Sequence, residues 1–409
     1  MHMETPTLPT LADAEPPPGV SSAATLLVSA VIPCLNEEQT LGLCIQKAYL
    51  GFAELGVGVR GEVVVADNGS TDRSVEIARH LGARVVHVRP KGYGAALLRG
   101  IAEAAGEIIV MADADDSYDW SAIAPFVRKV REGYDLVMGN RFKGGIMRGA
   151  MPRLHRYLGN PVLSLIARIA FRTNIGDFHC GMRAFTRSAF ARMQLKTTGM
   201  EFATEMVANA AHQGLRITEI PIVLYPDKRN RAPHLRSFRD GWRHLRFILT
   251  YAPDYLYLAP GIALLAVGAG LEALLLRGPA TIHGVYLGIH FLALGSLLTL
   301  VGFNIINLGV LAKTLMAQRY SGLKSRTVSL VRRRFSLEAG LLTGVALALL
   351  GAVIDAVIAA RWIAEFGQPM EATVHLAFVA TTAVVVGLNL IFSSFLLNMI
   401  LVEGPREEL

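Results

Sequence analysis

The fold of this chain is decided by the stretch Glu107-Ile-Ile-Val-Met-Ala-Asp113-Ala-Asp115-Asp116-Ser117. A short apolar run, of the kind found in buried strands, ends there in three carboxylates. Because alternate residues of a strand share a face, we expect Asp113 and Asp115 on one side and Asp116 on the other. Two neighbouring carboxylates repel each other, and a hard divalent cation, Mg²⁺ or Mn²⁺, would remove that repulsion. The alternative is an acidic, solvated turn that caps the following helix.

Segments of strand and helix type alternate on both sides of this stretch. The apolar, β-branched runs predict strands over residues 26–34, 62–68, 83–88, 107–112, 135–140 and 216–225. Amphipathic runs predict helices over residues 37–55, 71–81, 94–105, 121–132 and 201–212. This alternation indicates an α/β fold with a mostly parallel sheet and flanking helices on both faces. Ligands of such sheets bind at the carboxyl ends of the strands.

Polar clusters follow three successive predicted strands. The first is Pro33-Cys-Leu-Asn36-Glu37-Glu38, the second is Asp67-Asn-Gly-Ser70-Thr71-Asp72, and the third is the acidic stretch itself. Ser70 and Thr71 have an alternative role as helix caps after an Asn-Gly turn. Asp67 is harder to explain in that way, because it ends a buried strand without an obvious partner. Three such clusters at one edge of a sheet predict a binding site.

The C-terminal third of the chain predicts a membrane domain. Apolar runs at about 256–276, 285–310, 337–360 and 374–402 each exceed the roughly twenty residues that cross the hydrocarbon. The loop between the second and third runs carries seven Lys and Arg residues, from Lys313 to Arg334. The positive-inside rule then predicts four spans with the catalytic part and both termini in the cytoplasm. Glu272 and Asp355 lie inside spans, where we expect local pairing with Arg277 and Arg361.

The chain therefore divides into four predicted parts. Residues 1–24 are rich in Pro, Ala, Thr and Ser and predict a disordered tail without the features of a signal peptide. The α/β domain covers residues 25–236, an amphipathic juxtamembrane segment covers 237–256, and the four-helix transmembrane domain covers 257–409. An apolar helix at 161–171, flanked by arginines, is either a segment lying on the membrane or a core helix with a basic face.

Composition excludes several other classes of protein. The chain has 409 residues, 52% of them hydrophobic and 18% charged, with a net charge of +7. Its basic residues gather near the predicted membrane surface without the interleaved aromatics of RNA-binding proteins, so they suit anionic lipid and not nucleic acid. The three cysteines, Cys34, Cys44 and Cys180, form no Cys-x-x-Cys pair and predict neither a disulfide framework nor a zinc site.

With these motifs in view, about the first 240 residues resemble the family 2 glycosyltransferases of the GT-A fold. Within that family they are most similar to the polyprenyl-phosphate sugar transferases of the dolichol-phosphate mannose synthase group. The motifs that carry the resemblance keep their order along the chain. They are Val31–Glu38, Val65–Asp72, Asp113–Asp115, Gly139–Phe142, Asp177–Arg183, Phe202–Glu205 and Pro221–Ile222.

The resemblance implies an inverting, metal-dependent hexosyltransferase that uses a UDP- or GDP-hexose. It implies Mg²⁺ or Mn²⁺ on Asp113 and Asp115, with Asp115 and Arg141 as catalytic residues. The residues that it assigns to the nucleotide-sugar are Pro33, Asn36, Glu37, Asp67, Ser70, Asp113 and Glu205. This chain departs from the family at Ser117, where a Gln is common, and it lacks a clean match to the Ser-Lys pair that follows the last strand.

The acceptor that we expect is a polyprenyl phosphate, either undecaprenyl or dolichyl. A sugar hydroxyl needs a general base, whereas a lipid phosphate is already anionic at pH 7 and needs cations to hold it. Arginine binds phosphate through its two-pronged guanidinium, although each arginine has the alternative role of attracting anionic lipid. The candidates for the acceptor phosphate are Arg141, Arg153, Arg156, Arg229 and Arg231.

Other functions stay open at this point. One is transfer to another lipid or to a polysaccharide, although processive synthases carry a Gln-x-x-Arg-Trp motif that is absent around Arg361-Trp362. Another is an inactive membrane protein that binds nucleotide-sugars, which the intact Asp113 and Asp115 disfavour. The sequence also leaves a homo-oligomer open.

Overall fold

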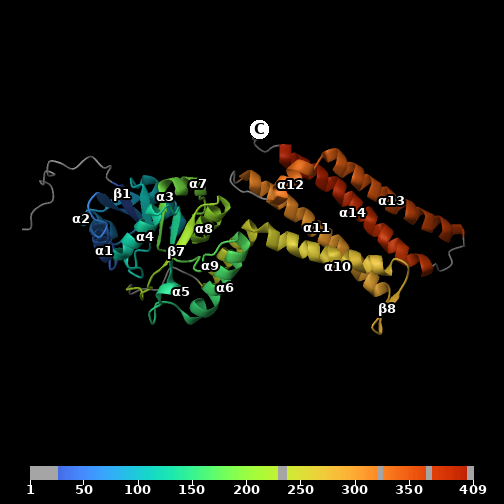
Figure 1. The fold of residues 1–409 in the computed structure, drawn as a ribbon, viewed down its shortest axis with the longest axis horizontal. Helices are drawn as coiled ribbons and strands as arrows, with labels where there is room; N and C mark the ends of the chain where they lie inside the picture. The colour runs from blue at the N-terminus through green and yellow to red at the C-terminus, as the bar shows by residue number, and fades with distance from the viewer. Residues whose placement is uncertain (1–25, 229–236, 320–325, 365–370, 403–409) are drawn as a thin grey trace, which may run out of the picture.

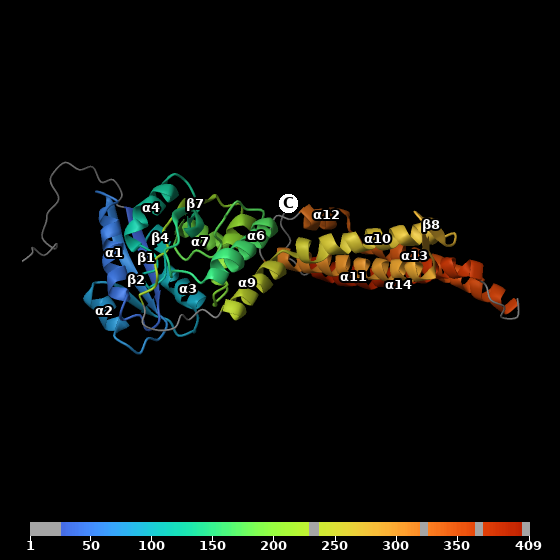
Figure 2. The same cartoon turned by 90° about the horizontal axis from the view of Figure 1, so that it is seen from below.

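The computed structural model describes residues 26–228, 237–319, 326–364 and 371–402. The chain forms an α/β part followed by a bundle of long helices that extends away from it (Figure 1). A second view, turned by 90°, shows the same separation of the two parts (Figure 2). The predicted tail and two candidate residues for the acceptor phosphate, Arg229 and Arg231, lie outside the described residues.

The α/β part is organised around one seven-stranded sheet with the order β3-β2-β1-β4-β6-β5-β7. Its strands are β1 (Leu26–Cys34), β2 (Val59–Asp67), β3 (Arg84–His87), β4 (Ile108–Met111), β5 (Leu136–Asn140), β6 (Arg183–Thr186) and β7 (Ile217–Pro221). The first four strands are parallel, as predicted. The sequence did not predict β6, which runs antiparallel to both of its neighbours, β4 and β5.

Helices cover both faces of the sheet. They are α1 (Leu41–Ala53), α2 (Ser74–His80), α3 (Tyr93–Glu103), η1 (Trp120–Ala122), α4 (Ile123–Arg131), α5 (Arg141–Gly144), η2 (His155–Gly159), α6 (Asn160–Phe171), α7 (Arg187–Met193), α8 (Phe202–His212) and α9 (Ser237–Tyr251). The first helix begins four residues later than predicted. Asn36 takes a left-handed conformation with φ of 57°, so the chain turns before the helix starts at Leu41.

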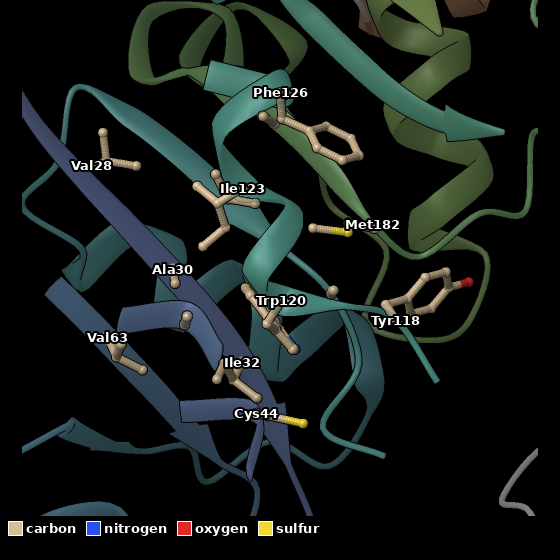
Figure 3. Packing of buried hydrophobic residues seen from close by; sticks show 14 of the residues in the cluster. Val28, Ala30, Ile32, Cys44, Val63, Tyr118, Trp120, Ile123, Phe126 and Met182 are labelled. Carbon is tan, nitrogen blue, oxygen red and sulfur yellow. The ribbon is translucent and has the colours of Figure 1, made fainter. Parts of the chain in front are cut away.

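The strand alternation sorts the core into two layers. Val28, Ala30 and Ile32 of β1 pack with Trp120 and with residues of α1 and α4 (Figure 3). Val31 points to the opposite layer, where it packs with residues of α3 and α8. Burying an aliphatic side chain of this kind stabilises the fold by about 1.5–3 kcal/mol. These two layers hold the strand ends in register.

Within the described residues, four helices are long and apolar enough to cross a membrane. They are α10 (Ala259–Leu275) with the preceding turn η3 (Asp254–Leu258), α11 (Ile289–Arg319), α13 (Leu337–Ala364) and α14 (Glu371–Val402). The basic helix α12 (Arg326–Arg334) lies between α11 and α13, and a small hairpin, β8 (Ala280–Ile282) with β9 (Val285–Leu287), lies between α10 and α11. The second span therefore begins at residue 289 and not at 285.

The two acidic residues inside the spans bond to hydroxyl groups. Glu272 accepts a hydrogen bond from Thr299 at 3.0 Å, and this bond links α10 to α11. Asp355 accepts one from Thr381 at 3.3 Å, and this bond links α13 to α14. The expected pairing with Arg277 and Arg361 is therefore wrong, since among the described residues these acids bond to hydroxyl groups of the facing helix and form no ion pair with either arginine.

We expect Gly100→Ala to destabilise the α/β domain. A Cβ at Gly100 would lie 2.8 Å from Cγ1 of Val31 and 2.9 Å from Cβ of Ala66, and neither atom can swing away. Overpacking of this kind costs about 1–3 kcal/mol. Gly42→Ala is the matched control, because its Cβ meets Ile77 at an ordinary 3.4 Å.

The measurement is a thermal unfolding curve of the whole protein in detergent, followed with a maleimide dye that fluoresces on reaction with cysteine. All three cysteines are buried in the α/β domain, so the dye reports the unfolding of that domain. An equal midpoint for the two variants would contradict the close approach of α3 to the sheet.

Candidate active site

The ends of β1 and β2 are joined by hydrogen bonds into one continuous surface. The backbone N–H of Asn36 donates to Oγ of Ser70 at 2.9 Å, and Oδ1 of Asn36 accepts from the N–H of Thr71 at 2.7 Å. The N–H of Glu37 donates to Oγ of Ser74 at 2.8 Å. The structure thus brings Asn36, Glu37 and Ser70 together, as the sequence predicted. Ser70 and Thr71 tie the two strand ends together, and α2 itself begins only at Ser74.

Asp67 closes this surface from the end of β2. Its carboxylate accepts from the N–H groups of Ser70 at 2.9 Å and Gly69 at 3.3 Å, and it lies 3.1 Å from Nδ1 of His87. Burial alone would raise the pKa of Asp67, but these hydrogen bonds outweigh it and lower the pKa below its usual range. His87 could not be foreseen from the sequence, because it ends a strand that lies twenty residues further along the chain.

The carboxylates of the acidic stretch lie in a turn beyond the sheet. Because β4 ends at Met111, the alternation of a strand does not extend to Asp113 and Asp115, and their positions are set by the turn. Oδ1 of Asp113 accepts from the hydroxyl of Tyr93 at 2.9 Å. Oδ1 of Asp115 accepts from the N–H of Ser117 at 3.0 Å and from its hydroxyl at 2.6 Å. Ser117 therefore orients Asp115.

Asp116 is separated from the other two carboxylates by its backbone. It has a φ of 59°, in the left-handed region that few residues other than glycine adopt. Its side chain is 1% exposed and forms ion pairs with Lys47 at 2.7 Å and Lys228 at 2.6 Å. Asp115 is also buried, at 8% exposed. The alternative of a solvated acidic turn is therefore wrong.

The loop Asp177–Arg183 lies directly against this turn. A Cβ at Gly181 would come within 2.8 Å of Oδ2 of Asp113 and 3.0 Å of the ring of Tyr118. The N–H of Gly181 donates to the hydroxyl of Tyr118 at 2.9 Å. Only glycine leaves room for the backbone here, so the loop forms one wall of the site.

Arg141 holds that loop from within. It is 7% exposed, and its Nε and Nη2 both donate to the carboxylate of Asp177 at 2.7 Å. Its own N–H donates to Asp177 as well, at 3.1 Å. Asp177 thus occupies two of the donors with which this guanidinium would bind the acceptor phosphate, and Nη1 lies 3.5 Å from the hydroxyl of Tyr118, so the assignment of Arg141 to that phosphate stays a prediction.

Two residues that the sequence did not single out complete the support of the loop. Glu219 of β7 accepts from the N–H groups of Gly176 at 2.7 Å and Asp177 at 2.9 Å. Arg183 is fully buried and donates to three backbone carbonyls, those of Phe178, Cys180 and Ala203. The conformation of the loop is therefore fixed by charged groups beneath it.

The remaining candidate residues lie further from the carboxylates. Glu205 is fully buried and accepts from the N–H groups of Lys196 and Thr197 and from the Thr197 hydroxyl, so it shapes the loop that precedes it. Arg153 is exposed, and Arg156 is half-buried with its guanidinium 5.5 Å from the ring of Tyr157. Pro33 lies near the end of β1.

We expect Asp177→Asn to destabilise the α/β domain by about 3–5 kcal/mol, because it leaves the buried charge of Arg141 without its counter-ion. Glu76→Gln is the control, since Arg73 and Glu76 form a fully exposed ion pair whose loss should leave the midpoint unchanged. The cysteine-dye unfolding curve measures both variants. Equal midpoints would show that the Arg141–Asp177 pair does not hold the domain together.

Two family models match the chain. Residues 29–193 match the glycosyl transferase family 2 model, and residues 310–401 match the model of the glycosyltransferase family 2 C-terminal transmembrane region. Among solved structures, glucosyl-3-phosphoglycerate synthase of Mycobacterium tuberculosis is 24% identical, with a TM-score of 0.42, over 58% of this chain and 85% of that one.

Curated relatives extend over both parts of the chain. The low-salt glycan biosynthesis hexosyltransferase Agl6 of Haloferax volcanii is 38% identical over 372 residues, which cover 91% of this chain and 88% of the relative. The dolichyl-phosphate hexose transferase of the same organism is 34% identical over 196 residues, 48% of this chain and 81% of the relative. The chain therefore belongs to glycosyltransferase family 2, as a membrane glycosyltransferase with a GT-A catalytic domain.

Proposed function

We propose that the chain transfers a hexose from a UDP- or GDP-hexose to a polyprenyl phosphate, undecaprenyl or dolichyl, with inversion, at the cytoplasmic face of the membrane. The observation that carries this proposal is the exposed apolar stripe along η2 and α6. Its members are 43–71% exposed and recur at helical spacing on one side: Leu154, Tyr157, Leu158, Val162, Leu165 and Ile169.

An exposed apolar stripe favours the interpretation that this helix lies on the membrane surface over the alternative of a core helix with a basic face. In Figures 1 and 2, α6 and α9 lie at the end of the catalytic domain nearest to α10. A site whose wall is built from the loop that follows α6 is accessible to an acceptor that is anchored in lipid. The similarity to a dolichyl-phosphate hexose transferase supports the same class of acceptor.

The donor is assigned to the surface formed by the ends of β1 and β2. Pro33, Asn36, Glu37, Asp67 and Ser70 would hold the nucleoside, and Asp113 would hold the sugar diphosphate. The buried Glu205 would act on the donor site indirectly. It supports a loop that contacts the start of α3 at Ala95, near Tyr93.

Asp113 and Asp115 would hold Mg²⁺ or Mn²⁺ together with the donor diphosphate. Hard carboxylate oxygens suit these ions, and the hydroxyls of Tyr93 and Ser117 orient both side chains. No group of three or more His, Cys, Asp or Glu residues that could hold a metal occurs among the described residues, so the substrate oxygens would complete the set. When bound, the ion would supply positive charge for the departing diphosphate.

A phosphate acceptor requires the protein to position it next to the sugar but does not require a catalytic base. An anionic phosphate oxygen attacks the anomeric carbon on the face opposite the diphosphate, the bond from that carbon to the diphosphate breaks, and the configuration inverts. The phosphate has its second pKa near 6, so no general base is needed at pH 7. Arg153, Arg156 and the residues Arg229 and Arg231 stay candidates for attracting it to the membrane surface.

We expect Asp113→Asn and Asp115→Asn to lower the transfer rate by about hundredfold or more, because each removes charge that opposes the diphosphate. The assay uses the purified protein in detergent with Mg²⁺ or Mn²⁺, undecaprenyl phosphate and radiolabelled UDP- and GDP-sugars. Label that moves into the organic phase, and that EDTA prevents from moving, is the expected product. Asp135→Asn is the control, since this half-buried residue accepts a hydrogen bond from the backbone N–H of Arg216, away from the site.

Full activity in either variant would contradict the metal assignment. Consumption of the donor without a lipid product would be consistent with glycosyltransferase activity but would refute polyprenyl phosphate as the acceptor.

The apolar stripe gives a separate prediction. In the double variant Leu158→Gln and Leu165→Gln, we expect weaker transfer to undecaprenyl phosphate in vesicles, because each change removes an exposed leucine from the membrane-facing side. Transfer to a short, detergent-soluble prenyl phosphate should stay at the wild-type rate. The control changes Leu50 and Val57, exposed leucine and valine residues elsewhere on the domain, to Gln. Equal loss with both acceptors would contradict docking through this stripe.

A further inference from the structure

The loop against Asp113 carries a histidine that the site described so far does not use. Both ring nitrogens of His179 are buried, and neither has a hydrogen-bond partner. Buried polar groups in proteins are nearly always bonded, since an unsatisfied one costs about 1–3 kcal/mol. The unsatisfied nitrogens of His179 therefore mark a position where a ligand would restore the missing bonds.

His179 lies between the carboxylate turn and the helix that leads into the membrane. Its ring meets the ring of His244 edge to face, with centroids 4.7 Å apart and planes at 87°. His244 belongs to α9, and its Nδ1 lies 2.8 Å from the hydroxyl of Thr204. Two residues after His179, Gly181 packs against Asp113. The same short loop thus contacts both the donor side and the membrane side of the site.

The surroundings of His179 are electropositive. Burial, together with His244, Arg141, Arg183 and His155, lowers the pKa of His179 well below its usual range. The carboxylate of this loop, Asp177, is already paired with Arg141. Since Asp177 compensates Arg141, the fully buried Arg183, which bonds to neutral backbone carbonyls, is the cation that favours an anion beside this imidazole.

We propose that His179, with His244 beside it, binds the phosphate group of the acceptor lipid. This inference rests on the proposed function and gives the acceptor phosphate a residue other than Arg141. The diphosphate of the donor belongs on the opposite side of Gly181, near Asp113. When a dianionic phosphate binds among these groups, His179 gains affinity for a proton, and both nitrogens of the imidazolium then donate to phosphate oxygens.

The test compares His179→Gln with wild type, as full-length protein in detergent, with farnesyl phosphate as acceptor and the sugar donor that the wild type uses. A hydrogen bond to a charged group is worth about 1.5–3 kcal/mol, so we expect the KM for farnesyl phosphate to rise by about tenfold to hundredfold. The KM for the donor should not change, because donor binding does not involve this side chain.

His212→Gln is the matched control. His212 is a second buried histidine with an unpartnered Nε2, and it packs on Phe171 with ring centroids 5.6 Å apart. Its loss should leave both KM values unchanged. A shared rise in donor and acceptor KM in His179→Gln would overturn the inference, since it would indicate a general loosening of the loop.

The experiment distinguishes failure of this inference from failure of the proposed function. If wild type transfers sugar to farnesyl phosphate and His179→Gln keeps the wild-type acceptor KM, the inference fails and the proposed function stands. If wild type transfers to no polyprenyl phosphate, both fail. Should His179→Gln not fold, as judged by the cysteine-dye curve, the wild type labelled with ¹⁵N-histidine provides the readout. Farnesyl phosphate must then shift the ring nitrogen resonances of one buried histidine, and unchanged resonances would refute the inference.

Discussion

The site depends on one buried ion pair, that between Arg141 and Asp177. Arg141 is fixed at the end of β5, and its two parallel hydrogen bonds set the position and the orientation of the loop that begins at Asp177. Glu219 bonds to the backbone at the start of this loop, and Arg183 bonds to its carbonyls further on. Because these charges are desolvated, their geometry must be satisfied completely, and the loop has a single stable conformation.

The buried acids of the domain are stabilised in different ways. Asp67 relies on backbone N–H groups and His87, Asp116 on two lysines, and Asp177 on one arginine. Asp113 accepts from the hydroxyl of Tyr93 and Asp115 from the hydroxyl of Ser117, and these hydrogen bonds orient the two carboxylates. Each of these buried acids is therefore held in place by its own set of donors.

The sequence predicted the parallel strands and their polar ends because both signals are local. Apolar runs separated by amphipathic helices indicate the sheet, and Asn36, Asp67 and Asp113 follow those runs directly. β6 was missed because it is four residues long and begins with a buried arginine. The ion pair of Arg141 was not foreseen because its partner, Asp177, lies 36 residues away. His87 and Glu219 were overlooked for the same reason, since contacts over long sequence separations leave no periodic pattern.

The pairing of β5 with β6 has a consequence for how this family can diversify. Met138 lies opposite Arg183 in the sheet, and β5 ends at Asn140, so residues 141–182 leave the sheet and return to it beside the strand that they left. The closure entropy of such an excursion grows only slowly with its length. Insertions or deletions in the part of the excursion before Gly176 can therefore accumulate without moving any strand. The exposed side of the segment that carries the apolar stripe can change in this way, whereas its buried side, with Ala167 and Phe171, stays tied to the core.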